Sequence, residues 1–312
     1  MSGTAVLAMA YGTPAGPEEL EAYYTHIRRG RPPTSELLAE LRGRYEAIGG
    51  HSPLLELTRA QVAGLERALA DEGHPDVRVA LGMKHAPPFI EDAVAELAVT
   101  GSRRILGLVL APHYSKLSVG EYAERASAAG AAAPGAPEVS VVRSWHLAAG
   151  YLDFLSQAVG DALRALPAEA GVRAHVLFTA HSLPTRILDE SDPYPMQLRE
   201  TAAAVAARAG LDRWSVAWQS AGRTPEPWLG PDVLEVLGDL AAADVDAVVV
   251  CPAGFVADHL EVLYDLDIEA RARARELGIA FARTASPNAD PRFMRTLANV
   301  VLEHVIDGAA TP

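Results

Sequence analysis

The chain alternates short, continuous apolar runs with longer amphipathic segments. Such runs, rich in β-branched residues, are typical of strands buried on both faces of a sheet. The segments between them have the periodicity of helices and are rich in Ala, Leu, Glu and Arg. The expected strands cover 4–11, 77–83, 104–112, 139–145, 174–182, 214–220, 247–255 and 279–286, and the clearest helical segments are 61–72, 91–99, 197–209 and 269–276. This alternation predicts an α/β fold with parallel sheets and right-handed crossovers.

The expected strands fall into two sets of four with similar spacing. The second, third and fourth members begin at 77 and 214, at 104 and 247, and at 139 and 279. The first members are farther apart, because an extra segment, 12–58, follows the first strand. We therefore expect two similar α/β units, 1–148 and 149–312, with the C-terminal helix free to pack back on the first. Ligands of open α/β sheets bind at the carboxyl ends of the strands, so a cleft between the units is the expected site.

Polar or titratable side chains stand where the strands are expected to end. They are Tyr11, Lys84, His85, His113, His181, Gln219 and Ser220. A histidine in such a place is more often a hydrogen-bonded structural residue than a catalyst, but nothing in the turn sequence "AHSLP" requires the imidazole of His181. Ser182 is not surrounded by a G-x-S-x-G motif, which argues against a serine hydrolase.

A row of acidic residues follows the seventh strand. If this stretch is helical, steps of three and four residues place the row on one face, and its members are Asp258, Glu261, Asp265 and Glu269. Like charges at this spacing repel by about 0.2–0.5 kcal/mol per pair, and no lysine or arginine follows until Arg271. A solvated helix face is the plain interpretation. The apolar flanks favour a cation site instead, and imidazole with carboxylate suits Fe²⁺ or Zn²⁺. Because the sequence has no H-E-x-x-H motif and no tight ligand cluster, we expect a metal that binds transiently rather than a permanent structural metal.

Composition narrows the class of protein. The chain has 40 acidic and 27 basic residues and a net charge of −13, which argues against non-specific binding to nucleic acid or anionic lipid. Its one cysteine, Cys251, excludes a disulfide within the chain and a cysteine-ligated cluster made by this chain alone. We see no secretory signal and no run of about 18 apolar residues. A soluble, cytoplasmic protein is expected.

The extra segment carries most of the local positive charge. "HIRRGR" contributes Arg28, Arg29 and Arg31, and "RYEAIGGHSPL" contributes Arg44, Tyr45 and Ser52. Arginines bind carboxylates through bidentate hydrogen bonds, although a solvated basic turn is an equal alternative. Together with apolar walls and the acidic row, this segment indicates a large, anionic, apolar ligand that meets a cation.

Motifs along nearly the whole chain resemble the ferrochelatase family, and most closely the coproporphyrin ferrochelatases of Gram-positive type. They run from the first strand to about residue 287 in one order, and include "AMAYGTP", "YYTHIRRGR", "TAHSLP", "WQSAGRTPEPWLGPDV" and "GFVADHLEVLYDLDIE". The resemblance implies two Rossmann-like units, each with a four-stranded parallel sheet flanked by helices, and a porphyrin in the cleft. It implies insertion of Fe²⁺ into coproporphyrin III, which gives Fe-coproporphyrin III in haem biosynthesis.

The resemblance also implies roles for individual residues. His181 and Glu261 match the catalytic metal-site pair, while Asp265 and Glu269 match acids that continue outward from it. A neutral imidazole can accept a pyrrole proton or ligate metal at cellular pH, but the family does not settle which residue takes the protons. The porphyrin-binding matches are Tyr11, Arg28, Arg44, Tyr45, Ser52 and Tyr122, with Lys84, His85, Arg29 and Trp228 as further candidates.

Partners and alternatives follow from the same resemblance. Fe²⁺ is expected as a substrate, and no resident cofactor or 2Fe–2S cluster is expected. We expect a monomer without stable membrane insertion. A transient contact with the next haem-pathway enzyme, a decarboxylase, is also expected. One alternative is a chelatase that uses protoporphyrin IX to give protohaem, or that prefers cobalt. Another is a porphyrin or haem carrier without catalysis. A carrier has no use for His181 facing an acidic row, which favours the enzyme.

Overall fold

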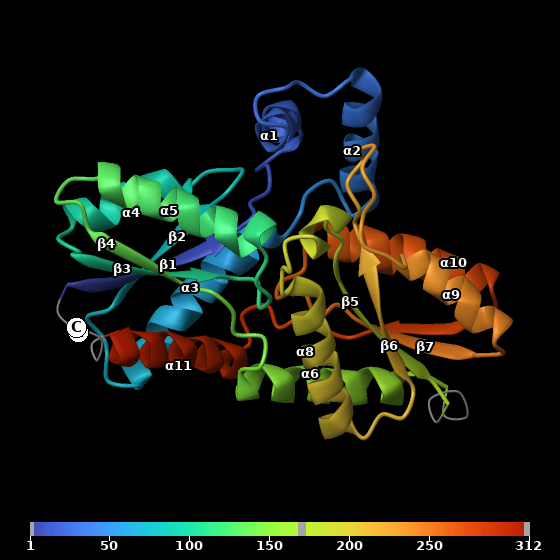
Figure 1. The fold of residues 1–312 in the computed structure, drawn as a ribbon. Coiled ribbons are helices and arrows are strands. Elements are labelled where there is room, and N and C mark those ends of the chain that lie inside the picture. Colours follow the sequence, from blue (N-terminus) through green and yellow to red (C-terminus); the bar gives the residue numbers. More distant parts are fainter. Residues whose placement is uncertain (1–2, 168–172, 309–312) are drawn as a thin grey trace.

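The computed structural model of the protein describes residues 3–167 and 173–308, and it contains two four-stranded parallel sheets (Figure 1). The first has the order β2 (Arg78–Met83), β1 (Thr4–Ala10), β3 (Arg104–Val109), β4 (Glu138–Val142). The second has the order β6 (Trp214–Gln219), β5 (His175–His181), β7 (Ala247–Cys251), β8 (Ala280–Arg283). The same strand order occurs in both sheets, and the predicted fold class is confirmed.

The apolar runs form strands that are covered on both faces. Every residue of β1 and of β7 is buried. Along β1, Val6 and Ala8 face one core, whereas Ala5, Leu7 and Met9 face another. This alternation follows from the two-residue period of a strand, and it explains why the runs are continuously apolar rather than alternating.

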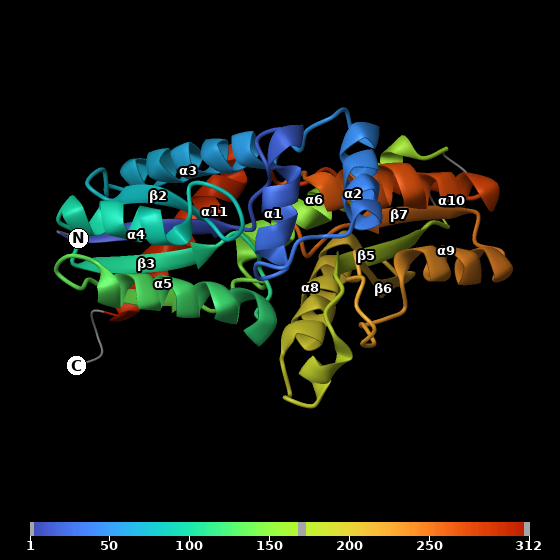
Figure 2. The same ribbon diagram turned by 90° about the horizontal axis from the view of Figure 1, so that it is seen from above.

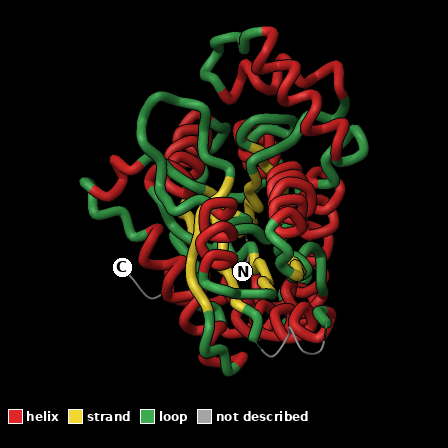
Figure 3. The backbone as a smooth tube through the Cα atoms, turned by 90° about the vertical axis from the view of Figure 1, so that its right-hand side faces the viewer, coloured by secondary structure: helices red, strands yellow, loops and turns green. Residues whose placement is uncertain are grey.

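Helices enclose both sheets (Figures 1 and 2). Around the first sheet they are α3 (Leu54–Asp71), α4 (Ile90–Val99) and α5 (Glu121–Ala132), and around the second α6 (Ala149–Ala165), α8 (Tyr194–Ala209), α9 (Val233–Ala242) and α10 (Arg271–Glu276). Local sequence sets several of their ends: α9 begins with a capping box of Asp232 and Glu235, and α8 stops at Gly210, which has φ +65°. Figure 3 shows the strands lying between layers of helix.

The C-terminal helix, α11 (Pro291–Gly308), joins the two halves. It follows the second sheet in the chain, yet it packs on α3 as well as on α6. Trp145, Tyr151 and Phe293 form an aromatic cluster there, with ring centroids 5.2 to 6.0 Å apart. They belong to one buried core that reaches both sheets. The boundary at 148/149 stays a prediction.

The segment 12–58 stands apart from the layers and bridges the two halves. It contains η1 (Pro17–Glu19), α1 (Leu20–Ile27), α2 (Ser35–Ala47) and the start of α3. In Figures 1 and 2, α1 and α2 project above the space between the sheets. The segment reaches the second half through a small cluster of Leu20, Tyr45 and Leu260. Short helical turns complete the fold: η2 (Lys116–Gly120), η3 (Thr185–Leu188) and η4 (Val262–Ala270).

Within the described part of the chain, no helix combines the length and apolar character needed to cross a membrane.

Candidate active site

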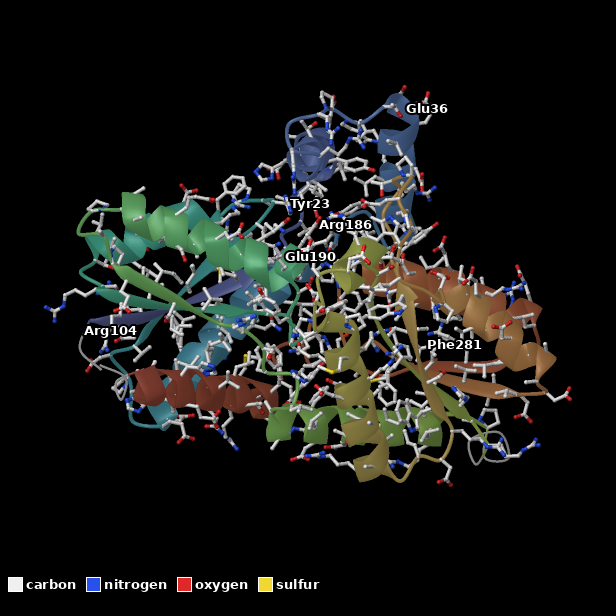
Figure 4. All side chains as sticks on the ribbon, viewed as in Figure 1. Tyr23, Glu36, Arg104, Arg186, Glu190 and Phe281 are labelled. Atoms are coloured by element: carbon white, nitrogen blue, oxygen red, sulfur yellow. The ribbon has the colours of Figure 1, made fainter. Side chains whose placement is uncertain are left out.

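A cavity of about 1230 Å³ lies at the carboxyl ends of the strands. Tyr11 follows β1, Lys84 follows β2 and His181 ends β5, so both sheets contribute to its lining. The segment 12–58 contributes several residues of α1, and Tyr45 of α2, to the lining. Figure 4 shows Tyr23 of this segment on the side of the sheets, whereas Glu36 points away at the outer end of α2. The cleft predicted between the units is therefore present.

Most of the predicted site residues meet in this cavity. Its lining includes Tyr11, Arg29, Tyr45, Ser52, Lys84, His85, Tyr122, His181, Trp228 and Glu261. The residues predicted for the site but placed outside the lining are Arg28, Arg44, Asp265 and Glu269. Arg28 lies over the ring of Tyr24 at 5.8 Å, and Arg44 turns to the acidic row.

The backbone next to β5 requires a glycine. Gly254 donates its N–H to the carbonyl oxygen of Thr179 at 2.9 Å. A Cβ at this position would lie 2.5 Å from the Cβ of Ala180 and 2.8 Å from its Cα, closer than such atoms approach. Glycine therefore lets the loop after β7 pack against the strand that carries His181.

His181 and Glu261 face each other inside the cavity. Nε2 of His181 is 3.6 Å from Oε1 of Glu261. The other ring nitrogen, Nδ1, is hydrogen-bonded to the backbone oxygen of Ser182. A carbonyl only accepts, so Nδ1 carries a proton and Nε2 is the atom turned to the carboxylate. Tyr194 holds the strand end by donating its hydroxyl to the His181 carbonyl at 2.9 Å.

The pair is ionised in the metal-free protein. Burial lowers the pKa of His181, but the charge and hydrogen bonding of Glu261 outweigh it and raise the pKa to about 9. Burial raises the pKa of Glu261, but the charges and hydrogen bonds of His181 and His259 hold it well below its usual range. The expectation of a neutral imidazole at His181 is therefore wrong for the free protein, because the adjacent carboxylate stabilises the cation.

Replacing Glu261 with glutamine should lower the pKa of His181 from about 9 to about 6.5 or below, because burial then meets less opposing charge. An NMR pH titration of the metal-free protein measures it. The pKa of His181 is higher in the folded than in the unfolded chain, so the contribution of His181 to stability is fully present below pH about 6.5 and is lost as pH rises through about 9. An unchanged pKa of His181 in Glu261→Gln would contradict this assignment.

His259 is a site residue that the sequence analysis missed. Its Nε2 is 3.5 Å from Oε2 of Glu261, and its Nδ1 donates to the carbonyl of Ala257 at 3.0 Å. Its position two residues before Glu261 was the only available signal. Among the described residues, no group of three or more His, Cys, Asp or Glu side chains could hold a metal ion. The geometry provides few ligands rather than a closed cage.

The acidic row is shorter and better compensated than predicted. The helix begins only at Leu260, so Asp258 lies outside it and pairs with Arg283 at 3.1 Å. The expectation of an uncompensated row is also wrong: Arg44 lies 2.5 Å from Asp265 and 3.9 Å from Glu269. These partners come from distant parts of the chain, which helical spacing does not reveal.

The charge of Glu261 reaches the tyrosines around the cavity. Enclosure by protein atoms is the main cause that raises the pKa of Tyr11, and the negative charges of Glu261 and Glu121 raise it further. Burial raises the pKa of Tyr45 to about 12, with a smaller contribution from Glu261. These phenols are therefore protonated at neutral pH and available as hydrogen-bond donors or as neutral oxygen ligands.

A second polar cluster lies beneath the segment 12–58. Lys84 is buried, donates to Glu121 and lies 5.1 Å from the ring of Tyr122. Arg29 approaches Glu121 at 3.4 Å. The Nδ1 atoms of His26 and His85 are 2.9 Å apart, and the ring of His85 lies 4.6 Å from that of Tyr11. Glu121 and His26 were not predicted from the sequence.

Nearly the whole chain is similar to known proteins. Residues 3–305 match the family model described as Ferrochelatase. The coproporphyrin III ferrochelatase of Geobacillus sp. (strain WCH70) is 45% identical over 302 residues, which are 96% of this chain and 97% of the relative. That of Bacillus subtilis (strain 168) is 44% identical over 300 residues, 96% of each chain.

Solved structures of low sequence identity share the fold. SirB from Bacillus subtilis with Fe³⁺ has a TM-score of 0.58 at 14% identity, over 99% of this chain and 98% of its own. The sirohydrochlorin chelatase SirB from Bacillus subtilis subspecies spizizenii, in complex with cobalt, has a TM-score of 0.54 at 12% identity, over 96% and 94%. At these identities the likeness concerns the fold alone. The match to the family model and to relatives more than 40% identical shows that the chain belongs to the ferrochelatase family.

Proposed function

We propose that this protein inserts Fe²⁺ into coproporphyrin III and releases Fe-coproporphyrin III in haem biosynthesis. The observation that carries the proposal is the pairing of His181 with Glu261, 3.6 Å apart in a large cavity between two parallel sheets. Relatives that are 42–46% identical along the chain are named coproporphyrin III ferrochelatase, which supports this choice of porphyrin.

The size and lining of the cavity suit a porphyrin. Its volume of about 1230 Å³ exceeds the range of about 300–1,000 Å³ of common ligand pockets. Apolar side chains such as Leu110, Leu117 and Leu260 line it together with the tyrosines described above. A flat macrocycle fits these walls, and its propionates meet the basic residues of the segment 12–58.

In this proposal His181 and Glu261 receive the iron. Two protons leave the pyrrole nitrogens as Fe²⁺ enters, so one free-base porphyrin and one Fe²⁺ give one iron porphyrin and two protons. Metal ligands must be deprotonated, so His181 also loses its imidazolium proton when Fe²⁺ binds Nε2. Glu261 favours this exchange, because its negative charge then neutralises the metal instead of the imidazolium.

We assign Tyr11 to the face of the ring, where its neutral phenol oxygen can ligate iron. The ring edge and the propionates are assigned to Ser52, Tyr45, Tyr122, Arg29 and Lys84. Beside the macrocycle we place His85 and Trp228. Arg28 and Arg44 lie outside the lining, so in this proposal they take propionates that project past the rim of the cavity. Four propionates give coproporphyrin III more anionic contacts than the two of protoporphyrin IX.

Asp265 and Glu269 continue from Glu261 toward solvent and are proposed to conduct the incoming cation. Burial and the charge of Glu261 raise the pKa of Asp265 to about 6, against the lowering influence of Arg44 and Ser220. Asp265 is therefore largely ionised at neutral pH, and Glu269 is half-exposed. Oxygen ligands of this kind suit a hydrated divalent cation.

Asp265→Ala should raise the apparent KM for Fe²⁺ about tenfold, equivalent to about 1.4 kcal/mol, because one charge of the path is lost. The affinity for the porphyrin should change little. Initial rates at varied Fe²⁺, under anaerobic conditions, measure the effect. Asp239→Ala, on the exposed surface of α9, is the matched control. Iron kinetics in Asp265→Ala equal to those of the control would remove Asp265 from the path.

The remaining features of the proposal concern the setting. We expect Fe²⁺ to act as a substrate without a resident cofactor; the one cysteine, Cys251, is buried in β7, whereas a 2Fe–2S cluster takes four ligands. A cytoplasmic monomer that passes its product to the next haem-pathway enzyme is part of the same proposal.

Anaerobic turnover with Fe²⁺ tests the proposed function. Coproporphyrin III and protoporphyrin IX are offered separately, and the loss of free-base absorbance is followed. Clear preference for coproporphyrin III supports the proposal. Preference for protoporphyrin IX overturns the substrate and keeps the chelatase, whereas tight binding without insertion indicates a carrier.

A further inference from the structure

Arg283, the last residue of β8, contacts two carboxylates that flank Glu261 in the sequence. Its Nε and Nη2 donate to the two oxygens of Asp267 at 3.0 and 2.8 Å. Its Nη1 donates to Oδ1 of Asp258 at 3.1 Å. Asp258 lies three residues before Glu261 and Asp267 six residues after it, so one guanidinium holds both ends of the segment that carries the proposed metal-site carboxylate.

The contact is supported on the side of Asp258. Ser286 donates to Asp258 Oδ1 at 2.7 Å and Asn288 to Oδ2 at 3.1 Å, while the backbone N–H of Asp258 donates to Asn288 Oδ1 at 2.9 Å. The side chain of Arg283 is only 13% exposed. Partly buried, charge-assisted and bidentate contacts of this kind fix geometry far better than exposed ion pairs.

The segment between the two aspartates needs such support. Val262–Ala270 is a π-helix. Its i→i+5 winding is rare, occurs mostly as single turns within α-helices, and is frequent at functional sites. Glu261 is the residue immediately before this winding, so the direction of its carboxylate depends on the phase in which the helix begins. A change of phase by one residue would turn its carboxylate away from His181 and His259, so contacts from outside the helix must select the observed winding.

We propose that Arg283 is a positioning residue for iron insertion: by holding Asp258 and Asp267 together, it keeps Glu261 aimed at His181. The inference rests on the proposed function, and Arg283 itself lies outside the cavity lining and touches neither His181 nor Glu261. A lysine cannot replace it, because one ammonium group lacks the planar fork that reaches both oxygens of Asp267 and Asp258 together.

The test compares Arg283→Lys with Arg271→Lys. Arg271 is a matched control, since it contacts the same Asp267 at 3.3 Å but is exposed and does not reach Asp258. Both variants keep the net charge. For each, kcat, the KM values for Fe²⁺ and coproporphyrin III, the porphyrin Kd by fluorescence, and hydrogen exchange of 258–270 are measured.

In Arg283→Lys we expect turnover to fall about 10- to 100-fold, since small misplacements of catalytic groups have effects of this size. The porphyrin Kd should stay within about twofold of the wild type. Hydrogen exchange should accelerate within 258–270 and remain unchanged in β1, β3 and β5. Arg271→Lys should match the wild type in every measurement. If Arg283→Lys does not fold, Asp267→Asn, which weakens the same contact, is expected to give the same pattern.

Wild-type turnover in Arg283→Lys overturns the inference, as does exchange that accelerates throughout the chain together with loss of porphyrin binding. Failure of the proposed function is a separate result, because the wild type would then insert no iron into any porphyrin. Local exchange in 258–270 would still report whether Arg283 fixes the segment.

Discussion

His181→Ala should lower the rate of iron insertion by at least about 10³-fold, while the porphyrin Kd changes by less than about threefold. The proposed pair would lose its nitrogen ligand, and a positioned proton-transfer group alone commonly contributes about 10²–10⁴-fold. Glu261 would also lose its main cationic partner and regain part of its ordinary pKa, because His181 is the leading influence that lowers it. Single-turnover absorbance measurements under anaerobic conditions give the rate, and fluorescence quenching gives the Kd.

His304→Ala is the control for this experiment, since His304 is exposed on α11 and does not belong to the cavity lining. Its turnover should equal that of the wild type. Near-normal turnover in His181→Ala would remove His181 from the chemistry. Equal loss of binding and turnover would assign it to the porphyrin rather than to the metal.

Phe293→Ala should lower the free energy of unfolding by about 3–5 kcal/mol, the range for removal of a buried aromatic side chain. Phe293 is fully buried, with its ring centroid 5.8 Å from that of Trp145 and 6.0 Å from that of Tyr151. Removal of the ring would leave a void in the core that reaches both sheets. We therefore expect a single cooperative unfolding transition that shifts as a whole to lower urea concentration. Urea denaturation followed by circular dichroism and by tryptophan fluorescence measures it.

Val99→Ala supplies the matched comparison, because Val99 is 73% exposed at the end of α4. Its unfolding free energy should change by less than about 0.5 kcal/mol. A loss below about 1 kcal/mol in Phe293→Ala, or two separated transitions of which only one moves, would show that α11 does not couple the two halves.

The architecture was predictable from the sequence because burial on both faces leaves a plain signal. Each of the eight apolar runs contains a strand, and their two sets of four become two sheets of the same order. His181 and Glu261 could be named, and the structure brings them together in the cavity. Both residues could be named because they lie at or near the ends of predicted strands. In a parallel sheet the carboxyl ends of all strands meet at the same edge.

The pairing of the acids could not be predicted. Arg44 and Asp265 are 221 positions apart, and their contact depends on how the segment 12–58 lies over the second sheet. Asp258 was expected in the row because a regular helix was assumed, whereas the helix starts later and winds more widely. The charge state of His181 likewise depends on a distance to Glu261, which spacing along the chain does not give.

The placement of α11 limits how the molecule can admit its ligand. Because α11 follows the second sheet in the chain and packs against α3, it connects the two halves. Separation of the halves would break the contacts of Phe293 with Trp145 and Tyr151. The segment 12–58 contacts the second half through a smaller apolar cluster, Leu20, Tyr45 and Leu260, and through ion pairs of Arg44 with Asp265 and of Glu40 with Arg223. If the proposed porphyrin binds here, we therefore expect it to enter by displacement of the segment 12–58 rather than by separation of the two sheets.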